Sequence, residues 1–422
     1  MILHYYKEFI QNHTKSVDEL EMQQNNSLKR LIIFCSDHVP HYQRLFKKLD
    51  ISPHDINTIH DLQKLPILTK ARIKSDPESF YPVNVKTKFI NGSTGGSTGV
   101  PLKYRMSPEC YERGVALLFK GWGKAGYRLG DRLAIIAGAS LVSNRESIKK
   151  NVKDVFLNFR HFSSYGMNSN MLDRYILKMN QWKPSYLRGY ASSLYLLAKH
   201  IEQNGIQIKF ILKGVFSTAE VLTIRQRELI EKVFNVKVYD NYGLNDGGLS
   251  AFECNLHKGM HIDYERSILQ IVNDAGKAVE DKLGRIVATS LYNYAMPFIR
   301  YDTGDVGLID RFPCPCGDNR PLLKQIYGRT TDYLKLNDKI IGSPVLTVLM
   351  GKTNIETYQI VQTHLDEINI KYISILSKAD ELFIKKSFFE HVGPIKINFI
   401  KVNTTEMLTE NKHKFIINEV CS

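Results

Sequence analysis

The sequence predicts an α/β protein with a large multi-layer N-terminal domain that contains mixed sheets, followed by a small α+β domain. First, strand and helix patterns alternate over residues 131–239, which favours layered packing and largely parallel strands. Second, residues 260–310 are rich in strand patterns. Third, the pattern changes after Gly328 to short strands and two helices. We therefore place the two domains at 1–330 and 331–422 of the 422-residue chain.

Local patterns place the elements of the large domain in order. Residues 1–50 are expected to be helical, because apolar side chains recur at helical spacing between Leu28 and Phe34. Another helix is expected over 108–126, since Ser107 suits an N-cap and proline suits the first turn. Residues 131–138 are typical of a buried strand. The remaining predicted elements are helices over 169–181, 191–204 and 220–234 and strands over 186–189, 210–216 and 236–239.

Composition narrows the classes of function. The net charge of +14 comes from lysines and arginines spread along the chain, without a block of like charges. Because no nucleic-acid-binding module is recognisable, this charge fits anionic substrates such as ATP, and equally a phosphorylated, nucleotide-linked or membrane-linked acceptor. Six scattered cysteines do not form a disulfide framework. No apolar run is long enough for a transmembrane segment and no signal-peptide layout is present, so we expect a cytoplasmic protein of undetermined oligomeric state.

The most distinctive segment is a glycine-rich loop in which hydroxyl side chains alternate with glycines. Glycine lets backbone N–H groups approach a ligand closely, and Ser and Thr hydroxyls add donors for an anion. Lys103 would supply a point charge for phosphate. The spacing differs from G-x-x-x-x-G-K-[ST], so this is a phosphate-binding loop of another kind. The candidate phosphate-binding residues are Ser93, Thr94, Gly95, Gly96, Ser97, Thr98, Gly99 and Lys103.

Three later segments, together with this loop, resemble the ordered core motifs of the adenylate-forming ligases. They are Asp240–Gly248, Phe298–Gly307 and Ile326–Asp332, and they occur in the family's order and at about its spacing. Further segments are similar to the phenylacetate–CoA ligase-like branch, which includes members associated with capsule polysaccharide synthesis. Those segments are His38–Tyr42, Asp61–Lys70 and Cys314–Gly317, and the whole resemblance extends from about residue 30 to the C-terminus.

The resemblance implies an AMP-forming acyl ligase that uses ATP and Mg²⁺. A carboxylic acid would be converted to an acyl-adenylate, and the acyl group would pass to coenzyme A or to an amine acceptor, in polysaccharide or secondary metabolite biosynthesis. The small C-terminal domain would be a lid that rotates between the two half-reactions. The alternative is a non-catalytic protein that keeps the fold and only binds nucleotide or acyl ligands, because a fold does not by itself establish turnover.

The same resemblance assigns contacts to the nucleotide. The backbone that follows the predicted strand near Ser217 would line the adenine, Tyr242 would stack on it, and Asp305 would accept both ribose hydroxyls. Arg329 would reach the ribose or the phosphates. Outside the loop, the implied nucleotide-binding residues are Ser217, Ala219, Glu220, Asn241, Tyr242, Gly243, Asp305 and Arg329.

Three residues are implied in catalysis. Asp246 stands where most relatives carry glutamate, and its carboxylate would help to hold Mg²⁺. A lysine of the lid would stabilise charge on the carboxylate and the α-phosphate. Alignment on a Lys-Phe pair selects Lys414, with Lys412 as the other candidate, because His413 replaces the family's glycine. The departures at Asp246 and His413 also favour the non-catalytic alternative.

The acyl pocket is expected near the strand ends of the large domain. Its candidate residues are Tyr165, Gly189, Tyr190 and Phe216, although aromatic residues at such positions also serve as core. The sequence does not identify the acid.

Three cysteines and a histidine form a separate candidate zinc site. The tight Cys314-Pro-Cys316-Gly pair, with the distant Cys254 and His261, could close a tetrahedral site. Some phenylacetate–CoA ligase-like proteins carry a structural zinc on matching residues. His257 is the alternative fourth ligand. Four protein ligands would leave no open position, so this zinc would be structural.

Overall fold

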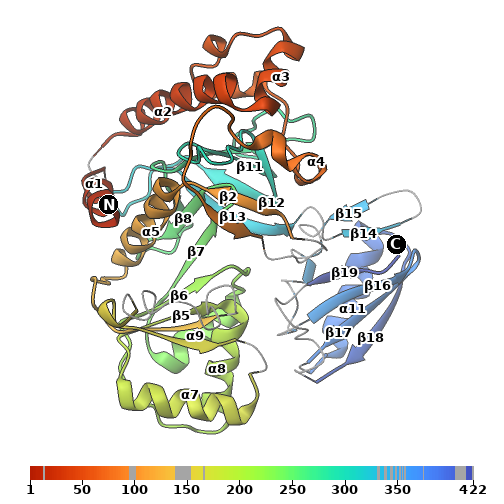
Figure 1. Ribbon diagram of the computed structural model, residues 1–422. Helices are drawn as coiled ribbons and strands as arrows, with labels where there is room; N and C mark the ends of the chain where they lie inside the picture. Colours follow the sequence, from red (N-terminus) through yellow and green to blue (C-terminus); the bar gives the residue numbers. More distant parts are fainter. Residues whose placement is uncertain are drawn as a thin grey trace. The chain divides into compact units, whose positions relative to one another are not determined.

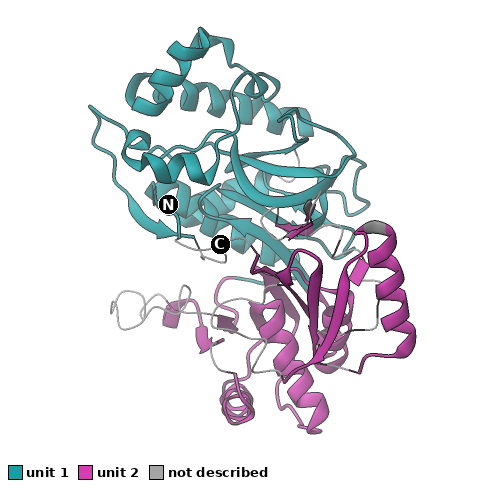
Figure 2. Ribbon diagram, turned by 90° about the vertical axis from the view of Figure 1, so that its right-hand side faces the viewer, with its two compact units in different colours: residues 1–128, 239–326 teal, residues 129–238, 327–422 magenta. Residues whose placement is uncertain are grey.

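The computed structural model of the chain divides into two compact units (Figure 2). Unit 1 comprises residues 1–128 and 239–326, and unit 2 comprises residues 129–238 and 327–422. The domain boundary near residue 330 stays a prediction. The described residues are 1–12, 15–94, 101–137, 154–164, 167–329, 333–336, 340–342, 346, 349–350, 353, 355, 358–373, 375–403 and 415–420.

Unit 1 begins with a series of helices (Figure 1), and serine side chains cap the starts of α2 and α5. α2 (Val17–His38) starts after Ser16, whose side chain accepts from the Glu19 N–H while the Glu19 carboxylate accepts from the Ser16 N–H. α5 (Pro108–Gly123) starts after Ser107, as the sequence predicts. The other elements are α1 (Ile2–Gln11), α3 (Pro40–Leu49) and α4 (Lys70–Ser75), with 3₁₀ helices η2 (Pro53–Asp55), η3 (His60–Lys64) and η4 (Pro77–Phe80).

The strands of unit 1 form a sheet and a separate hairpin. The sheet order is β10–β11–β12–β13–β9–β8–β7, and the pairs β10–β11, β11–β12, β13–β9, β9–β8 and β8–β7 are antiparallel. Its main core joins side chains of α2 and α3, such as Leu31 and Tyr42, to sheet residues such as Ile286. The hairpin is β1 (Ile90–Ser93) with β2 (Lys103–Met106). The sheet strands are β7 (Val238–Leu244), β8 (Leu249–Glu253), β9 (Met260–Ile262), β10 (Ser267–Val272), β11 (Gly284–Ser290), β12 (Tyr301–Asp310) and β13 (Leu322–Arg329).

The first part of unit 2 contains four parallel strands in the order β6–β5–β3–β4. Alternating helix and strand patterns predict this pairing, because parallel neighbours need crossover connections. Leu187, Val215 and Ile136 pack with the helices in one apolar cluster. The elements are β3 (Leu133–Ala137), β4 (Phe159–Ser163), β5 (Tyr186–Tyr190), β6 (Gly214–Thr218), α7 (Ser169–Trp182), α8 (Ala191–Gln203) and α9 (Ile224–Phe234).

Two element boundaries in this part differ from the prediction. β6 starts at Gly214, not at Phe210, because Phe210 and Leu212 are buried in the cluster without lying in a strand. α9 starts only after Thr223, whose hydroxyl accepts from the Gln226 N–H in a capping box. The backbone between them is not helical: Ala219 has a φ of 68°. The buried apolar residues before Gly214 therefore produced a strand-like pattern without a strand. The helix starts later than predicted because its N-cap is Thr223.

The C-terminal part of unit 2 is an α+β arrangement, in agreement with the predicted fold class. Its sheet order is β18–β17–β16–β19, and β14 pairs with β15 in a hairpin. Ile384 and Phe388 of α11 join Ile360 and Ile370 of the sheet in one buried cluster. The bounds are β14 (Tyr333–Lys335), β15 (Ile340–Gly342), β16 (Tyr358–His364), β17 (Glu367–Tyr372), α11 (Lys378–His391), β18 (Lys396–Lys401) and β19 (Ile416–Asn418).

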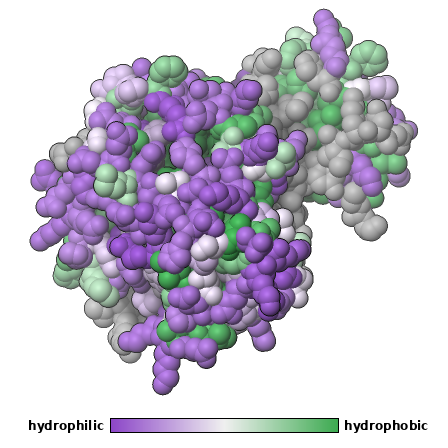
Figure 3. Space-filling model, turned by 90° about the horizontal axis from the view of Figure 1, so that it is seen from above, coloured by the Kyte–Doolittle hydropathy of each residue, from purple (hydrophilic) through white to green (hydrophobic). Residues whose placement is uncertain are grey.

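The surface in Figure 3 is largely hydrophilic, with apolar side chains in small scattered groups. Such scattering is ordinary for a protein surface. Among the described helices, none combines the length and apolar character that a membrane span requires.

A histidine of α3 that packs against η4 should make the fold acid-sensitive. The His41 ring stacks on the Phe80 ring, with centroids 4.2 Å apart. Burial, aided by Arg72 and Arg44, lowers the pKa of His41 to about 4. An unfolded chain would protonate it near pH 6.5. Between these values the unfolded state binds the extra proton, so the free energy of unfolding falls as the pH is lowered from about 6.5 towards 4.

We expect His41→Phe to flatten this pH dependence. The variant keeps an aromatic ring against Phe80 and removes the titrating group. Thermal melts of both proteins between pH 7 and pH 4.5 measure the effect, and the wild type should lose more stability over that range. Parallel pH profiles would show that other groups set the acid sensitivity.

Candidate functional site

Four metal-ligating side chains meet in unit 1. The ligand atoms of Cys254, His261, Cys314 and Cys316 all lie within 4.8 Å of one another. The sulfurs of Cys254 and Cys314 are 3.8 Å apart, and Cys316 Sγ is 3.3 Å from His261 Nε2. A tetrahedral zinc ion would require S–S and S–N edges of about 3.8 and 3.5 Å, given its usual bond lengths. The arrangement therefore has the dimensions of a zinc site.

The strand register and a tight turn bring these residues together. β8 and β9 are antiparallel, with Phe252 opposite His261, so the chain that leaves β8 at Cys254 returns beside it. After β12, the Gly317 N–H donates to the Cys314 carbonyl oxygen at 3.2 Å. Gly317 has a φ of 89°, which glycine adopts without strain. This turn directs both cysteines of the Cys-Pro-Cys-Gly segment towards His261.

His261 and His257 have different surroundings. His261 Nδ1 lies 3.4 Å from the Arg320 carbonyl oxygen and 3.6 Å from Asp318 Oδ2, so Nε2 faces the cysteines. Such outer contacts orient metal-ligating histidines. Burial lowers the pKa of His261 to about 4, which favours the neutral imidazole that metals bind. His257 Nδ1 lies 3.1 Å from Glu253 Oε2 instead. The geometry favours His261 over His257.

A buried ionic network supports this cluster. Lys120 Nζ contacts Glu265 at 2.7 Å and Asp263 at 3.1 Å. Arg320 pairs with Asp263 and with Asp318, which also accepts from Lys124 at 3.0 Å. Loss of one partner would leave an uncompensated buried charge. The network ties α5 to the loop that carries Cys314 and Cys316.

The neck of the glycine-rich loop is the β1–β2 hairpin. Ser93 pairs with Lys103, and the Thr94 N–H donates to the Leu102 carbonyl oxygen at 3.0 Å. The Thr94 hydroxyl accepts from the Leu102 N–H at 3.0 Å. Thr94 therefore closes the loop. The predicted phosphate contacts Gly95, Gly96, Ser97, Thr98 and Gly99 lie outside the described residues.

Two predicted nucleotide residues of unit 1 are hydrogen-bonded to each other. Tyr242 Oη donates to Asp305 Oδ2 at 2.8 Å. Burial, and then the Asp305 carboxylate, hold the pKa of Tyr242 well above its ordinary value. The Asp305 N–H donates to Thr303 Oγ1 at 3.1 Å, and Gly304 has a φ of 79°. Together these contacts fix Asp305 beside the Tyr242 ring.

A second phenol–carboxylate pair involves Asp246. Tyr301 Oη donates to Asp246 Oδ2 at 2.6 Å, and both residues are buried. Tyr301 is a residue that the sequence reasoning did not select. The signal for it was its position in the same segment as Asp305, four residues before it. It connects that segment to the Tyr242–Asp246 segment.

Buried polar atoms without partners mark two other predicted nucleotide residues. Within the described residues, Asn241 Oδ1 and Ser217 Oγ have no hydrogen-bond partner. Such groups are uncommon in folded proteins and are often completed by a ligand or water. Glu220 Oε2 accepts from the Ser192 N–H at 2.9 Å, which is a structural contact. Gly243 is exposed within β7, and Arg329 is the last residue of β13.

Comparison with known proteins supports the predicted family resemblance. No protein-family model matches the chain. The chain is 26% identical over 432 residues to Protein CapK of Staphylococcus aureus, covering 99% of this chain and 93% of CapK. It is 24% identical over 388 residues to a phenylacetate-coenzyme A ligase of Thermus thermophilus, covering 89% and 84%. Over nearly its whole length, the chain is thus similar to the phenylacetate–CoA ligase-like branch of the adenylate-forming ligases.

Solved ligases share the fold of this phenylacetate–CoA ligase-like chain. 2-Hydroxyisobutyryl-CoA ligase, in the postadenylation state with R3-HIB-AMP, matches with a TM-score of 0.76 at 18% identity, over 97% of this chain and 91% of the ligase chain. Anthranilate CoA ligase AuaEII, with anthranoyl-AMP, matches with a TM-score of 0.54 at 15% identity, over 89% and 75%. The predicted α/β fold class and family resemblance are confirmed.

The predicted acyl-pocket residues of this phenylacetate–CoA ligase-like chain do not share one environment. Phe216 is buried and stacks on Tyr186, with ring centroids 5.5 Å apart. Tyr190 is also buried, at the end of β5. Gly189 faces α8: an added Cβ would lie 3.2 Å from Leu194 Cδ2 and 2.9 Å from the Ile136 carbonyl oxygen. Gly189 therefore allows close helix packing. Tyr165 lies outside the described residues.

Both predicted catalytic lysines, Lys412 and Lys414, lie outside the described residues. Their assignment stays a prediction.

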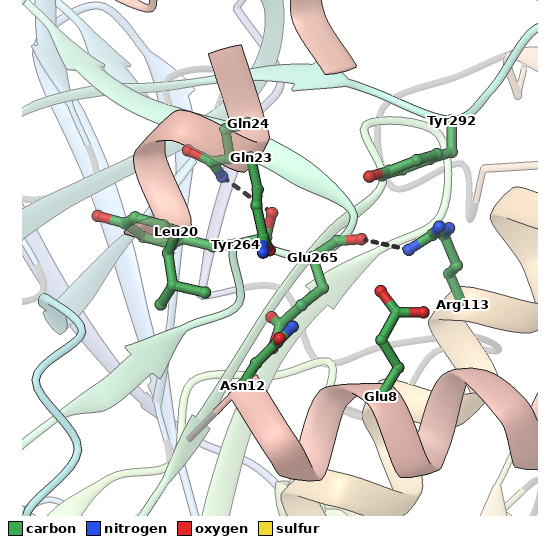
Figure 4. A pocket seen from close by; sticks show the side chains of 9 residues that line it. All are labelled: Glu8, Asn12, Leu20, Gln23, Gln24, Arg113, Tyr264, Glu265 and Tyr292. Carbon is green, nitrogen blue, oxygen red and sulfur yellow. Dashed lines mark hydrogen bonds between the residues drawn. The ribbon is translucent and has the colours of Figure 1, made fainter. Parts of the chain in front are cut away.

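The cavity drawn in Figure 4 is not a substrate pocket. Its volume of about 20 Å³ corresponds to roughly one water molecule. Its walls are polar and held by hydrogen bonds. Gln24 donates to the Tyr264 carbonyl oxygen at 3.1 Å, and Arg113 donates to the Glu265 carbonyl oxygen at 3.3 Å. It is a packing feature where α1 and α2 meet α5 and the segments that flank β10 and β11.

Proposed function

We propose that this chain is an AMP-forming acyl–CoA ligase. A carboxylate oxygen of the acid attacks the α-phosphorus of ATP, the bond to the β-phosphate oxygen breaks, and pyrophosphate leaves. The sulfur of coenzyme A then attacks the acyl carbon, its proton is released, and AMP leaves. Relatives named phenylacetate-coenzyme A ligases support this order, as does a neighbour solved with 2-HIB-AMP and CoA in its thioesterification state. These relatives favour coenzyme A over an amine as the acceptor. The proposed location is the cytoplasm, where both ATP and coenzyme A are present.

The observation that carries the proposal is a pair of carboxylates in unit 1, each held by a tyrosine hydroxyl. Asp305 Oδ2 accepts from Tyr242, and Asp246 Oδ2 accepts from Tyr301. An ionised carboxylate fixed in this way can accept ribose hydroxyls or contribute a metal ligand without reorganising. We assign binding of the ribose hydroxyls to Asp305. The paired carboxylates favour a catalytic protein over the non-catalytic alternative.

Asn241 supplies a further contact for the nucleotide. Its Oδ1 atom is a buried acceptor without a partner among the described residues. The exocyclic amino group of adenine is a donor, so an adenine on the Tyr242 ring could satisfy it. Ser217 Oγ is a second such atom and suits the same ligand class.

The Mg²⁺ that the resemblance implies fits Asp246. Mg²⁺ in nucleotide sites takes one or two carboxylates and the substrate phosphates as ligands. Asp246 offers a hard carboxylate oxygen, because only Oδ2 has a hydrogen bond within the described residues. When bound, the ion would neutralise charge on the phosphates during transfer.

We assign a structural zinc to Cys254, His261, Cys314 and Cys316. Four protein ligands leave no position for substrate or water, so the ion would stabilise unit 1 and take no part in acyl transfer.

ATP–pyrophosphate exchange tests the proposed function. The wild type should catalyse exchange with one class among aryl, fatty, amino and sugar acids. Lys414→Ala should lower that exchange by 100-fold or more, on the order of other preorganised charge contacts, and Lys412→Ala should change it little. The reverse pattern would assign catalysis to Lys412. Adding coenzyme A should then give the acyl thioester by mass spectrometry.

Two outcomes would oppose this function. ATP binding without exchange for any acid would favour the non-catalytic alternative. No ATP binding in calorimetry would contradict the assignment altogether.

A further inference from the structure

Asp246 is short and buried, so its orientation depends on its neighbours. The residue is only 6% exposed, and an aspartate reaches one methylene less far than a glutamate. Within the described residues, Asp246 accepts a hydrogen bond from Tyr301 Oη at Oδ2, at 2.6 Å. Hydrogen bonds from a hydroxyl to an ionised carboxylate are short and strong. This contact fixes one carboxylate oxygen and thereby the direction of the other.

The phenol of Tyr301 is itself held rigidly. Tyr301 is fully buried in β12 and pairs with Ala288 of β11. Its ring lies 5.1 Å from the Phe298 ring, and the Lys70 ammonium lies 5.9 Å from the ring centre. On the side of Asp246, a Cβ added at Gly247 would come within 3.4 Å of the Tyr301 ring. A phenol packed on these sides cannot readily move away from its acceptor.

We propose that Tyr301 is a positioning residue for the metal ligand. By donating to Oδ2, it would leave Oδ1 of Asp246, in a fixed orientation, to bind the Mg²⁺ that accompanies ATP. The inference rests on the proposed function, because it assumes that Asp246 binds this ion. Tyr301 moves no proton in the reaction; its hydroxyl supplies orientation only.

The second tyrosine pair gives a matched comparison. Tyr242 donates to Asp305 at 2.8 Å, and Asp305 is the ribose ligand in the proposed function. The two phenols therefore act on different parts of one substrate. Removing the Tyr301 hydroxyl should weaken binding of the metal ion, whereas removing the Tyr242 hydroxyl should weaken binding of the nucleoside part of ATP.

The test is Mn²⁺ binding, measured by electron paramagnetic resonance at a saturating concentration of a non-hydrolysable ATP analogue. Tyr301→Phe removes one hydroxyl and should weaken Mn²⁺ binding roughly tenfold, the usual effect of losing a hydrogen bond to a charged group. The Mg²⁺ concentration for half-maximal ATP–pyrophosphate exchange should rise by the same factor. Tyr242→Phe should raise the KM for ATP and leave Mn²⁺ binding at saturating analogue unchanged.

A rescue experiment separates positioning from general damage. In the Tyr301→Phe background, Asp246→Glu lengthens the carboxylate and should recover Mn²⁺ affinity to within a few-fold of the wild type. Asp246→Asn, which keeps Tyr301, should weaken Mn²⁺ at least as much as Tyr301→Phe does. This second variant decides the matter if Tyr301→Phe melts at a much lower temperature than the wild type.

The inference and the proposed function fail in different ways. Unchanged Mn²⁺ affinity in Tyr301→Phe, or in Asp246→Asn, overturns the positioning role while exchange by the wild type stands. Absence of exchange in the wild type opposes the proposed function, and Mn²⁺ binding still reports on the Tyr301–Asp246 pair.

Discussion

Replacing His261 with asparagine is expected to remove a bound zinc ion and to destabilise unit 1 strongly. The cluster has tetrahedral dimensions, and Nε2 of His261 lies 3.3 Å from Cys316 Sγ. Without the ion, three clustered thiols remain, and burial raises the pKa of Cys316 to about 12. Loss of a structural metal is among the few changes that cost about 4 kcal/mol or more. Plasma mass spectrometry should find one zinc per wild-type chain, and thermal melts should show a drop of roughly 10 °C in the variant.

His257→Asn is the matched control. His257 has a φ of 51°, which asparagine tolerates, and its ring contacts Glu253 outside the cluster. We expect full zinc content and a melting temperature within a few degrees of the wild type. If His257→Asn lost its zinc and His261→Asn kept it, His257 and not His261 would be the fourth zinc ligand. A wild-type chain purified without zinc, and stable to chelators, would oppose the metal site.

The second large effect is expected from Asp305→Ala, which should lower kcat/KM for ATP in the exchange reaction by roughly 100- to 1000-fold. The carboxylate would accept two ribose hydroxyls, and each hydrogen bond to a charged group contributes about 1.5–3 kcal/mol. The variant also removes the acceptor of the Tyr242 hydroxyl. Initial rates over a range of ATP concentrations, at saturating acid, give the value.

Asp302→Asn controls for damage to β12. Asp302 lies three residues earlier, and its Oδ2 atom accepts from Arg285 Nη1 at 2.7 Å. It is not assigned to the nucleotide site, so exchange should stay within a few-fold of the wild type. Equal losses in Asp302→Asn and Asp305→Ala would mean that the strand was disturbed and that the ribose contact is not the cause.

Local chemistry explains which elements could be predicted. The start of α5 follows from Ser107 and Pro108, because a cap and a first-turn proline act within a few residues. The parallel strands of unit 2 follow from alternating patterns that each span one element. The predicted start of β6 was wrong because it depended on distant contacts. Phe210 and Leu212 are buried in a cluster with residues distant in sequence, and an apolar run that is buried in this way has the same sequence pattern as a buried strand.

The candidate site divides in the same way. Asp246, Tyr242 and Asp305 could be selected from the sequence, because each lies in a segment that resembles one of the family's ordered motifs. Tyr301 could not be chosen from the sequence, because a buried aromatic residue in a strand is most often core. Its role emerges only where its hydroxyl meets Asp246, 55 residues away.

By itself, the sequence predicted the α/β class, the resemblance to the adenylate-forming ligases and the residue types of the candidate nucleotide and metal sites, because local patterns and ordered motifs carry this information. Only the tertiary structure favours His261 over His257 in the candidate metal site, and only it pairs each carboxylate with a tyrosine. Strand register makes these choices: the β8–β9 pairing brings His261 beside the cysteines, and no local pattern encodes which distant residues a register will join.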